Sequence, residues 1–138
     1  MQSHRERVVL RELTSSIVGT GAARFATCDA AIETSVYGPP AAIEEVVRAV
    51  IEAFTAERLD GKPAIRFAAG DGTIGLQVER AGADLNTTIV DDLGLDRWPG
   101  LHEAARTVRL LGGSLEVLAT EERLQRAIVE LPSAPRSG

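Results

Sequence analysis

Hydrophobic side chains recur three or four residues apart in three stretches of this chain, which is the spacing of an amphipathic helix. The clearest stretch follows Gly38-Pro39-Pro40 and ends before Asp60-Gly61, with charged residues mainly on its opposite face. A second, 101–111, runs into a glycine pair that suits a helix end. A third, weaker one covers 8–18. The sequence therefore predicts three helices. The apolar face of the clearest one consists of Ile43, Val46, Val47, Val50, Ile51 and Phe54.

Runs of β-favouring residues predict strands before and between these helices. Residues 64–69 and 73–79 flank Gly70-Asp71-Gly72, and an Asp-Gly turn between two such runs is a strong hairpin signal. A second hairpin is expected from 114–119 and 125–131. Shorter strands are expected at 23–28, at 32–36 and within 85–90.

This order of elements predicts an α/β fold. Its form is a two-layer sandwich, in which a mixed, mostly antiparallel sheet of about five strands carries three helices on one face. A chain of 138 residues is long enough to build one such domain with its own core. We expect the domain to span 8–132, after a flexible N-terminus at 1–7 and before a disordered tail at 133–138.

Composition narrows the function. The net charge is −5 and aromatic residues make up 4% of the chain, which argues against binding to a nucleic acid backbone or stacking on its bases. No apolar run approaches the ~20 residues of a membrane span. The single cysteine, Cys28, allows no internal disulfide, so a cytoplasmic setting and a buried, inert thiol are expected.

Two segments resemble the ATP-binding domain of sensor histidine kinases, in the GHKL superfamily. VYGPPAAIEEVVRAVIEAF (36–54) is similar to the start of that family's asparagine-box helix, and LLGGSLEV (110–117), within WPGLHEAARTVRLLGGSLEV (98–117), is similar to the end of its last helix and the start of its terminal hairpin. The resemblance extends from about Val8 to Pro132 and implies the Bergerat-type fold of that family.

The resemblance also implies where Mg²⁺ would be held. In the family, two oxygen-bearing side chains four residues apart on the first long helix bind the ion, which requires hard oxygen ligands. The matching positions here are Ala49 and Ala53, and a methyl group cannot coordinate a metal. No metal site is therefore expected, although a shifted register would bring Glu45 or Glu52 to this place.

The family's first glycine box, Asp-x-Gly-x-Gly, matches residues 79–83. Glu79 keeps the charge of the aspartate that accepts a hydrogen bond from adenine, so it is a candidate vestige of the nucleotide site. Ala81 and Ala83 replace both glycines, which removes the close backbone approach that glycine allows. Gly82, one residue out of register, is a second candidate vestige.

The second glycine box, Gly-x-Gly-Leu, cradles phosphate with backbone amides at a helix start. It matches 98–101, where bulky Trp98 replaces the first glycine, Pro99 has no N–H to donate, and only Gly100 is retained. The Gly-Thr step that the family carries before its last strand falls at Leu124-Gln125. The expected interpretation of Trp98 is that it fills the vacated pocket; the alternative is an exposed anchor for a partner.

Other residues with possible chemistry have simpler explanations. His102 precedes an acid, as a phosphoacceptor histidine does, but the comparison places it in the first turn of the last helix, where a surface histidine is expected. His4 lies in the charged N-terminus. The acidic group Asp91, Asp92 and Asp96 lacks the alternating spacing of a calcium loop, so a solvated loop is expected.

The combined losses predict a signalling or regulatory protein-interaction domain, a pseudokinase of two-component type without catalysis or cofactor. Its expected partner is a response regulator, a kinase subunit or a second copy of itself in a homodimer. The alternative is a divergent ATP-binding histidine kinase, or an anti-sigma-type serine kinase. It would use Glu79 for adenine and Glu45 or Glu52 for Mg²⁺. A third possibility is that the chain is a domain excised from a larger protein.

Overall fold

A computed structural model gives the fold, and it describes residues 6–18, 24–25, 34–56, 63–80, 87–91, 94–120 and 123–133. The helices and strands alternate along the chain. In order they are β1 (Glu6–Val9), α1 (Leu10–Val18), β2 (Arg24–Phe25), β3 (Ser35–Gly38), α2 (Pro40–Ala56), β4 (Ala64–Gly70), β5 (Thr73–Glu79), β6 (Thr88–Ile89), the 3-10 helix η1 (Gly94–Arg97), α3 (Pro99–Leu110), β7 (Ser114–Ala119) and β8 (Leu124–Pro132).

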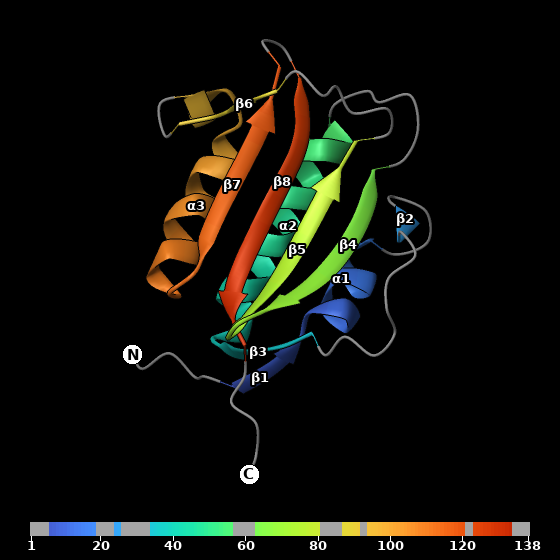
Figure 1. Cartoon of the computed structure of the whole chain (residues 1–138), viewed down its shortest axis with the longest axis vertical. Coiled ribbons are helices and arrows are strands. Elements are labelled where there is room, and N and C mark those ends of the chain that lie inside the picture. Colours follow the sequence, from blue (N-terminus) through green and yellow to red (C-terminus); the bar gives the residue numbers. More distant parts are fainter. Residues whose placement is uncertain are drawn as a thin grey trace.

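The main sheet has six strands in the order β2-β4-β5-β8-β7-β6. β2 runs parallel to β4, and every other neighbouring pair is antiparallel. β1 and β3 form a separate two-stranded sheet. Figure 1 shows α2 and α3 together behind the main sheet, and α1 packs against α2. The predicted α/β sandwich, with a mostly antiparallel sheet and three helices, is confirmed.

The core lies between the sheet and the helices because strands and helices each turn one apolar face inward. Along β5, Ile74, Leu76 and Val78 are buried, while the alternate residues are half-buried on the opposite face. The apolar stripe predicted for the long helix is buried as a whole, from Ile43 to Phe54. Burial of these facing rows is the main force that holds the helices to the sheet.

Two turns use glycine for its positive φ. Gly72 (φ 75°) closes the β4–β5 hairpin at the predicted Asp71-Gly72 step, and Gly112 (φ 84°) ends α3. The amide of Gly113 donates to the carbonyl of Val108 at 2.9 Å, which closes the helix end before β7 begins. Both predicted hairpins are therefore present with nearly the predicted bounds.

Strand pairing extends beyond residues 8–132 at both ends. Glu6 and Arg7, placed in the flexible terminus, belong to β1 and pair with Gly38 and Tyr37 of β3. Ser133, placed in the disordered tail, forms a bridge with Val36. The expected helix 8–18 begins at Leu10, because Val8 and Val9 complete β1. No helix in the described ranges has the length and apolar character to cross a bilayer.

Candidate functional site

Helices α2 and α3 meet at two of the positions that the resemblance assigns to the nucleotide site. A Cβ placed on Gly100, in the first turn of α3, would lie 3.8 Å from Cβ of Ala49 on α2. Ala49 and Ala53 are both half-buried and pack against the core. The structure thus brings together Ala49 and Gly100, two positions that the resemblance matches to the family's nucleotide site.

The first turn of α3 offers few amide donors to an anion. Pro99 has no N–H, and the amides of Leu101 and His102 both donate to the carbonyl of Trp98, at 2.8 and 3.3 Å. Of the amides in this turn, within the part of the chain that the structure describes, only that of Gly100 has no acceptor. A phosphate cradle needs several such donors aimed at one point.

Trp98 precedes this turn and is half-buried against the core rather than fully exposed. The Arg97 guanidinium stacks over its ring, 4.4 Å from the centroid. This placement favours the packing role over the exposed-anchor role that the sequence left open. The stacked pair holds the start of α3 in place through a cation–π contact and apolar burial.

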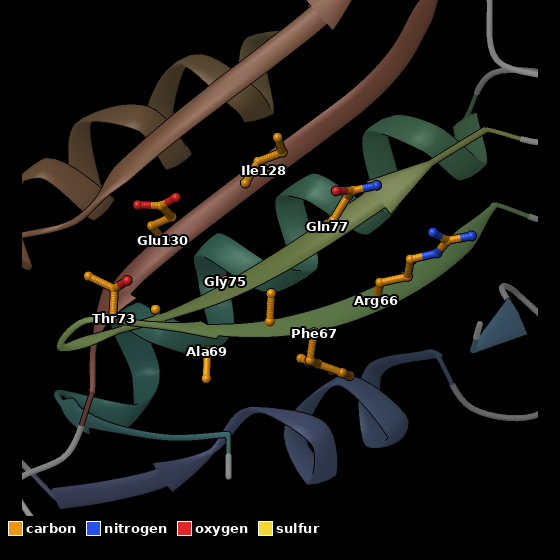
Figure 2. A pocket seen from close by; sticks show the side chains of 10 residues that line it. Arg66, Phe67, Ala69, Thr73, Gly75, Gln77, Ile128 and Glu130 are labelled. Atoms are coloured by element: carbon orange, nitrogen blue, oxygen red, sulfur yellow. The ribbon is translucent and has the colours of Figure 1, made fainter. Parts of the chain in front are cut away.

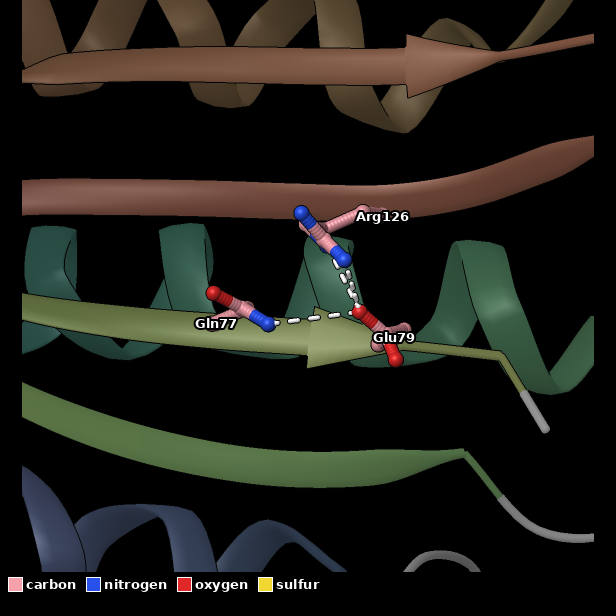
Figure 3. A network of polar contacts seen from close by, with 3 residues as sticks. All are labelled: Gln77, Glu79 and Arg126. Atoms are coloured by element: carbon pink, nitrogen blue, oxygen red, sulfur yellow. Dashed lines mark hydrogen bonds and ion pairs between the residues drawn. The ribbon is translucent and has the colours of Figure 1, made fainter. Parts of the chain in front are cut away.

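Glu79 lies on the face of the sheet that the helices leave open. It alternates with buried Val78, and its carboxylate accepts a hydrogen bond from Nε of Arg126 on β8 at 2.7 Å. Gln77 donates to the same oxygen at 3.4 Å, and Figure 3 shows the three side chains together in front of the sheet. The side chain of Glu79, the candidate vestige of the nucleotide site, therefore lies on the opposite side of the sheet from Ala49 and Gly100.

Arg80 is the residue that continues the inward row of Ile74, Leu76 and Val78. Its backbone N–H donates to the carbonyl of Gln125 at 3.0 Å, and Nη1 donates to Oε1 of the same residue at 3.4 Å. Gln125 is 1% exposed, and its amide donates to Oγ1 of Thr120 at 3.3 Å. An Arg–Gln pair thus stands on the helix side at the end of β5. The strict alternation of apolar residues before Arg80 is the sequence signal that could have identified it.

Comparison with known proteins finds similarity in the fold and not in the sequence. No protein-family model and no curated protein matches the sequence. Among solved structures, the Acinetobacter baumannii histidine kinase AdeS superposes with a TM-score of 0.70 at 15% identity, over 98% of this chain and 70% of that one. The ATP binding domain of PrrB from Mycobacterium tuberculosis gives 0.67 at 14% identity, over 95% of this chain and 98% of that one.

The chain has the fold of a histidine-kinase ATP-binding domain. At these identities the likeness establishes the fold alone. The ligands that this domain can bind depend on its own residues, above all those at the end of β5 and at the α2–α3 contact.

The two acids considered as replacement metal ligands, Glu45 and Glu52, are both exposed on α2. Both lie outside the apolar stripe that packs on the sheet, and Glu45 is one helical turn before Ala49 on the same side of α2. No cluster of three or more His, Cys, Asp or Glu side chains with metal-binding geometry occurs among the residues described.

The remaining candidates divide between structural roles and residues not described. Oδ1 of Asp91 accepts a hydrogen bond from the amide of Gly94 at 2.8 Å, so Asp91 caps η1, and Asp96 is exposed. His102 is half-buried in the first turn of α3. Six of the candidate residues lie outside the described ranges; they are His4, Cys28, Ala81, Gly82, Ala83 and Asp92.

The open face of the sheet carries a shallow depression of about 290 Å³, drawn in Figure 2. Gly75 and Ala68, which lie opposite each other on β5 and β4, are among its lining residues, together with the longer side chains of Arg66, Gln77 and Glu130. It arises because these small residues lie side by side on the sheet. It is separated by the sheet from the α2–α3 contact.

Replacing Gly100 with alanine tests whether the start of α3 requires a residue without a side chain at this position. Gly100 is exposed and a Cβ there meets only ordinary van der Waals contact, so Gly100→Ala should raise the free energy of unfolding by about 0.5 kcal/mol. The matched control is Gly112→Ala at the other end of α3, where φ of 84° should make alanine cost about 1 kcal/mol. Urea denaturation measures both. A loss of stability at Gly100 would contradict the contact described above.

Proposed function

We propose that this chain is a cytoplasmic regulatory interaction domain in which a histidine-kinase ATP-binding fold no longer binds nucleotide. The observation that carries the proposal is Arg80 on the helix side of the sheet, since a guanidinium has no acceptor for an adenine amino group. Alanine at positions 49 and 53 removes the oxygen ligands of Mg²⁺, and the first turn of α3 leaves one amide free. Placing Mg²⁺ and donors around the phosphates is what phosphoryl transfer depends on.

The proposed activity is protein binding, with a response regulator, a kinase subunit or a second copy as the partner. The support is an exposed apolar residue at the edge of the main sheet: Ile89 of β6 is 67% exposed and lies beside Leu118 of β7. Light scattering of the purified chain tests the second copy, and calorimetry against a receiver domain tests the response regulator. Ile89→Ser should weaken whichever complex forms.

Calorimetric titration with ATP and Mg²⁺ tests the loss of nucleotide binding. We expect no saturable binding tighter than about 1 mM, because among the described residues Arg80 stands where an adenine acceptor is needed and alanines stand at positions 49 and 53. The ATP binding domain of PrrB, under the same conditions, is the positive control. Micromolar affinity for ATP or ADP in this chain would overturn the proposal and favour the divergent kinase instead.

A further inference from the structure

The open face of the main sheet, which points away from α2 and α3, is not covered by any helix of the described chain (Figure 1). It carries a group of apolar side chains at one side. Ile89 of β6 is 67% exposed, and Leu118 lies directly opposite it on β7. Ile128 follows on β8, next to Leu118 along the diagonal. An apolar group on a face that is otherwise polar is typical of a surface that binds another protein.

The charges on this face follow a pattern, which the strand register makes visible as three rows across β4, β5, β8 and β7. In that order of strands, the first row is Ala64, Glu79, Arg126 and Leu118, the second is Arg66, Gln77, Ile128 and Glu116, and the third is Ala68, Gly75, Glu130 and Ser114. The second row has a base at one end and an acid at the other. The first row has an acid and a base at its two inner positions. Reading either row backwards therefore exchanges its positive and negative positions.

The outer charges of the second row have no partner of their own. Arg66 and Glu116 are both exposed, and neither forms an ion pair or a hydrogen bond among the described residues. They stand three strands apart, or about 14 Å, which is too far for an ion pair within one molecule. Charges of opposite sign that cannot meet within one copy can meet between two copies.

We infer that a second copy of this chain packs face to face on the open sheet, related by a two-fold axis that runs parallel to the strands between β5 and β8. This axis exchanges β4 with β7 and β5 with β8, so it reverses each row. Arg66 of each copy then lies opposite Glu116 of the other, and Glu79 lies opposite Arg126. A two-fold interface needs a surface that complements itself, and two sheets stacked about 10 Å apart in an aligned manner are a common form of it.

The depression on this face has a place in the same arrangement. Glu130 of one copy lies opposite Gly75 of the other, where the absence of a side chain leaves room for it. Arg66 and Gln77 line this depression, as Figure 2 shows, so the incoming carboxylate enters beside a guanidinium and an amide. Opposite charge and shape thus agree in the third row as well.

The size of the face predicts a weak dimer that depends on concentration. Four strands about 4.8 Å apart and about 24 Å long give roughly 450 Å² per copy, about half of what each partner contributes to a standard interface. We therefore expect a dissociation constant of about 100 μM for the whole chain, measured by sedimentation equilibrium. The inference rests on the proposed function in one respect, because it selects the second copy among the proposed partners and assigns it a surface.

Reversing the two outer charges tests the reciprocal contact. The Arg66→Glu chain has acids at both outer positions and the Glu116→Arg chain has bases at both, so each alone should dimerise about tenfold more weakly or worse. An equimolar mixture of the two variants should recover the affinity of the parent, because a mixed dimer has an acid opposite a base at both contacts. This recovery is expected only if position 66 of one copy meets position 116 of the other.

Arg106→Glu and Glu103→Arg reverse the same two charges at exposed positions of α3, on the other side of the sheet, and are the matched controls. Neither should change the dissociation constant, alone or mixed. Circular dichroism checks that every variant folds, which we expect because positions 66 and 116 are exposed. A parent chain that stays monomeric at about 1 mM, or a mixture that associates no better than the single variants, would overturn the inference.

Two further results keep this inference separate from the proposed function. If the parent is monomeric and Arg66→Glu instead weakens binding to a receiver domain in calorimetry, the open face binds a response regulator and the inference is wrong. The loss of nucleotide binding is decided by the ATP titration alone. A monomeric chain therefore leaves that part of the proposed function standing, and micromolar ATP affinity in a dimeric chain would overturn that part alone.

Discussion

Gly113→Ala should lower the free energy of unfolding by about 3 kcal/mol, the largest effect that we expect from adding a single methyl group to this chain. A Cβ at this position would lie 2.0 Å from the carbonyl oxygen of Glu130 and 3.2 Å from Cδ2 of Leu131. The first of these contacts is with backbone, so it can be relieved only by moving β8 or the start of β7. Either shift disturbs strands that hold the centre of the sheet. Urea denaturation followed by far-UV circular dichroism measures the loss.

Gly75→Ala is the matched control, because Gly75 of β5 also lies against Glu130 of β8. A Cβ there would meet its nearest atom, the carbonyl oxygen of Ala68, at 3.6 Å, which is an ordinary contact. Alanine is also less costly to order than glycine, so this variant should be within about 0.5 kcal/mol of the parent or more stable. Equal losses in the two variants would show that glycine at 113 serves no steric purpose.

The fold was largely predictable because its signals are local. The stripe from Ile43 to Phe54 has helical spacing along its whole length, and it is buried on one face of α2. Asp71-Gly72 between two β-favouring runs specifies its hairpin through Gly72 alone, which takes the required positive φ. In such segments the turn residue and the hydrophobic period agree, so tertiary contacts need not be known.

β1 was not predicted because its evidence is not local. Val8 and Val9 fit the start of the helical stripe that follows them, and a strand of four residues is too short to show alternation. What makes it a strand is its pairing with β3, in which Arg7 lies opposite Tyr37. That partner is thirty positions further along the chain, and no pattern within Glu6–Val9 predicts the pairing.

The candidate site was harder to predict than the fold, because a shift of one residue exchanges the two faces of a strand. Matching Glu79 to the family's aspartate preserved its charge but placed it on the open face, where it binds Arg126. The alternation of Leu76 and Val78 pointed to Arg80 as the inward residue instead. The alternation of buried residues therefore predicts which face of a strand a residue lies on, whereas similarity of charge to a family residue does not.

The second large effect concerns the start of α3, the helix that packs against α2. Leu101 is fully buried one residue after Gly100, so it anchors the turn that brings Gly100 to Ala49. Leu101→Ala should cost about 3 kcal/mol of unfolding free energy, from lost burial and the cavity left behind. Urea denaturation measures the loss.

Leu110→Ala removes the same atoms from the same helix at a position that is 85% exposed, and it is the matched control. It should change the free energy of unfolding by no more than about 0.5 kcal/mol. The comparison isolates burial, since side-chain volume and helix propensity change equally in both variants. Similar losses from Leu101 and Leu110 would contradict the packing of α3 described here.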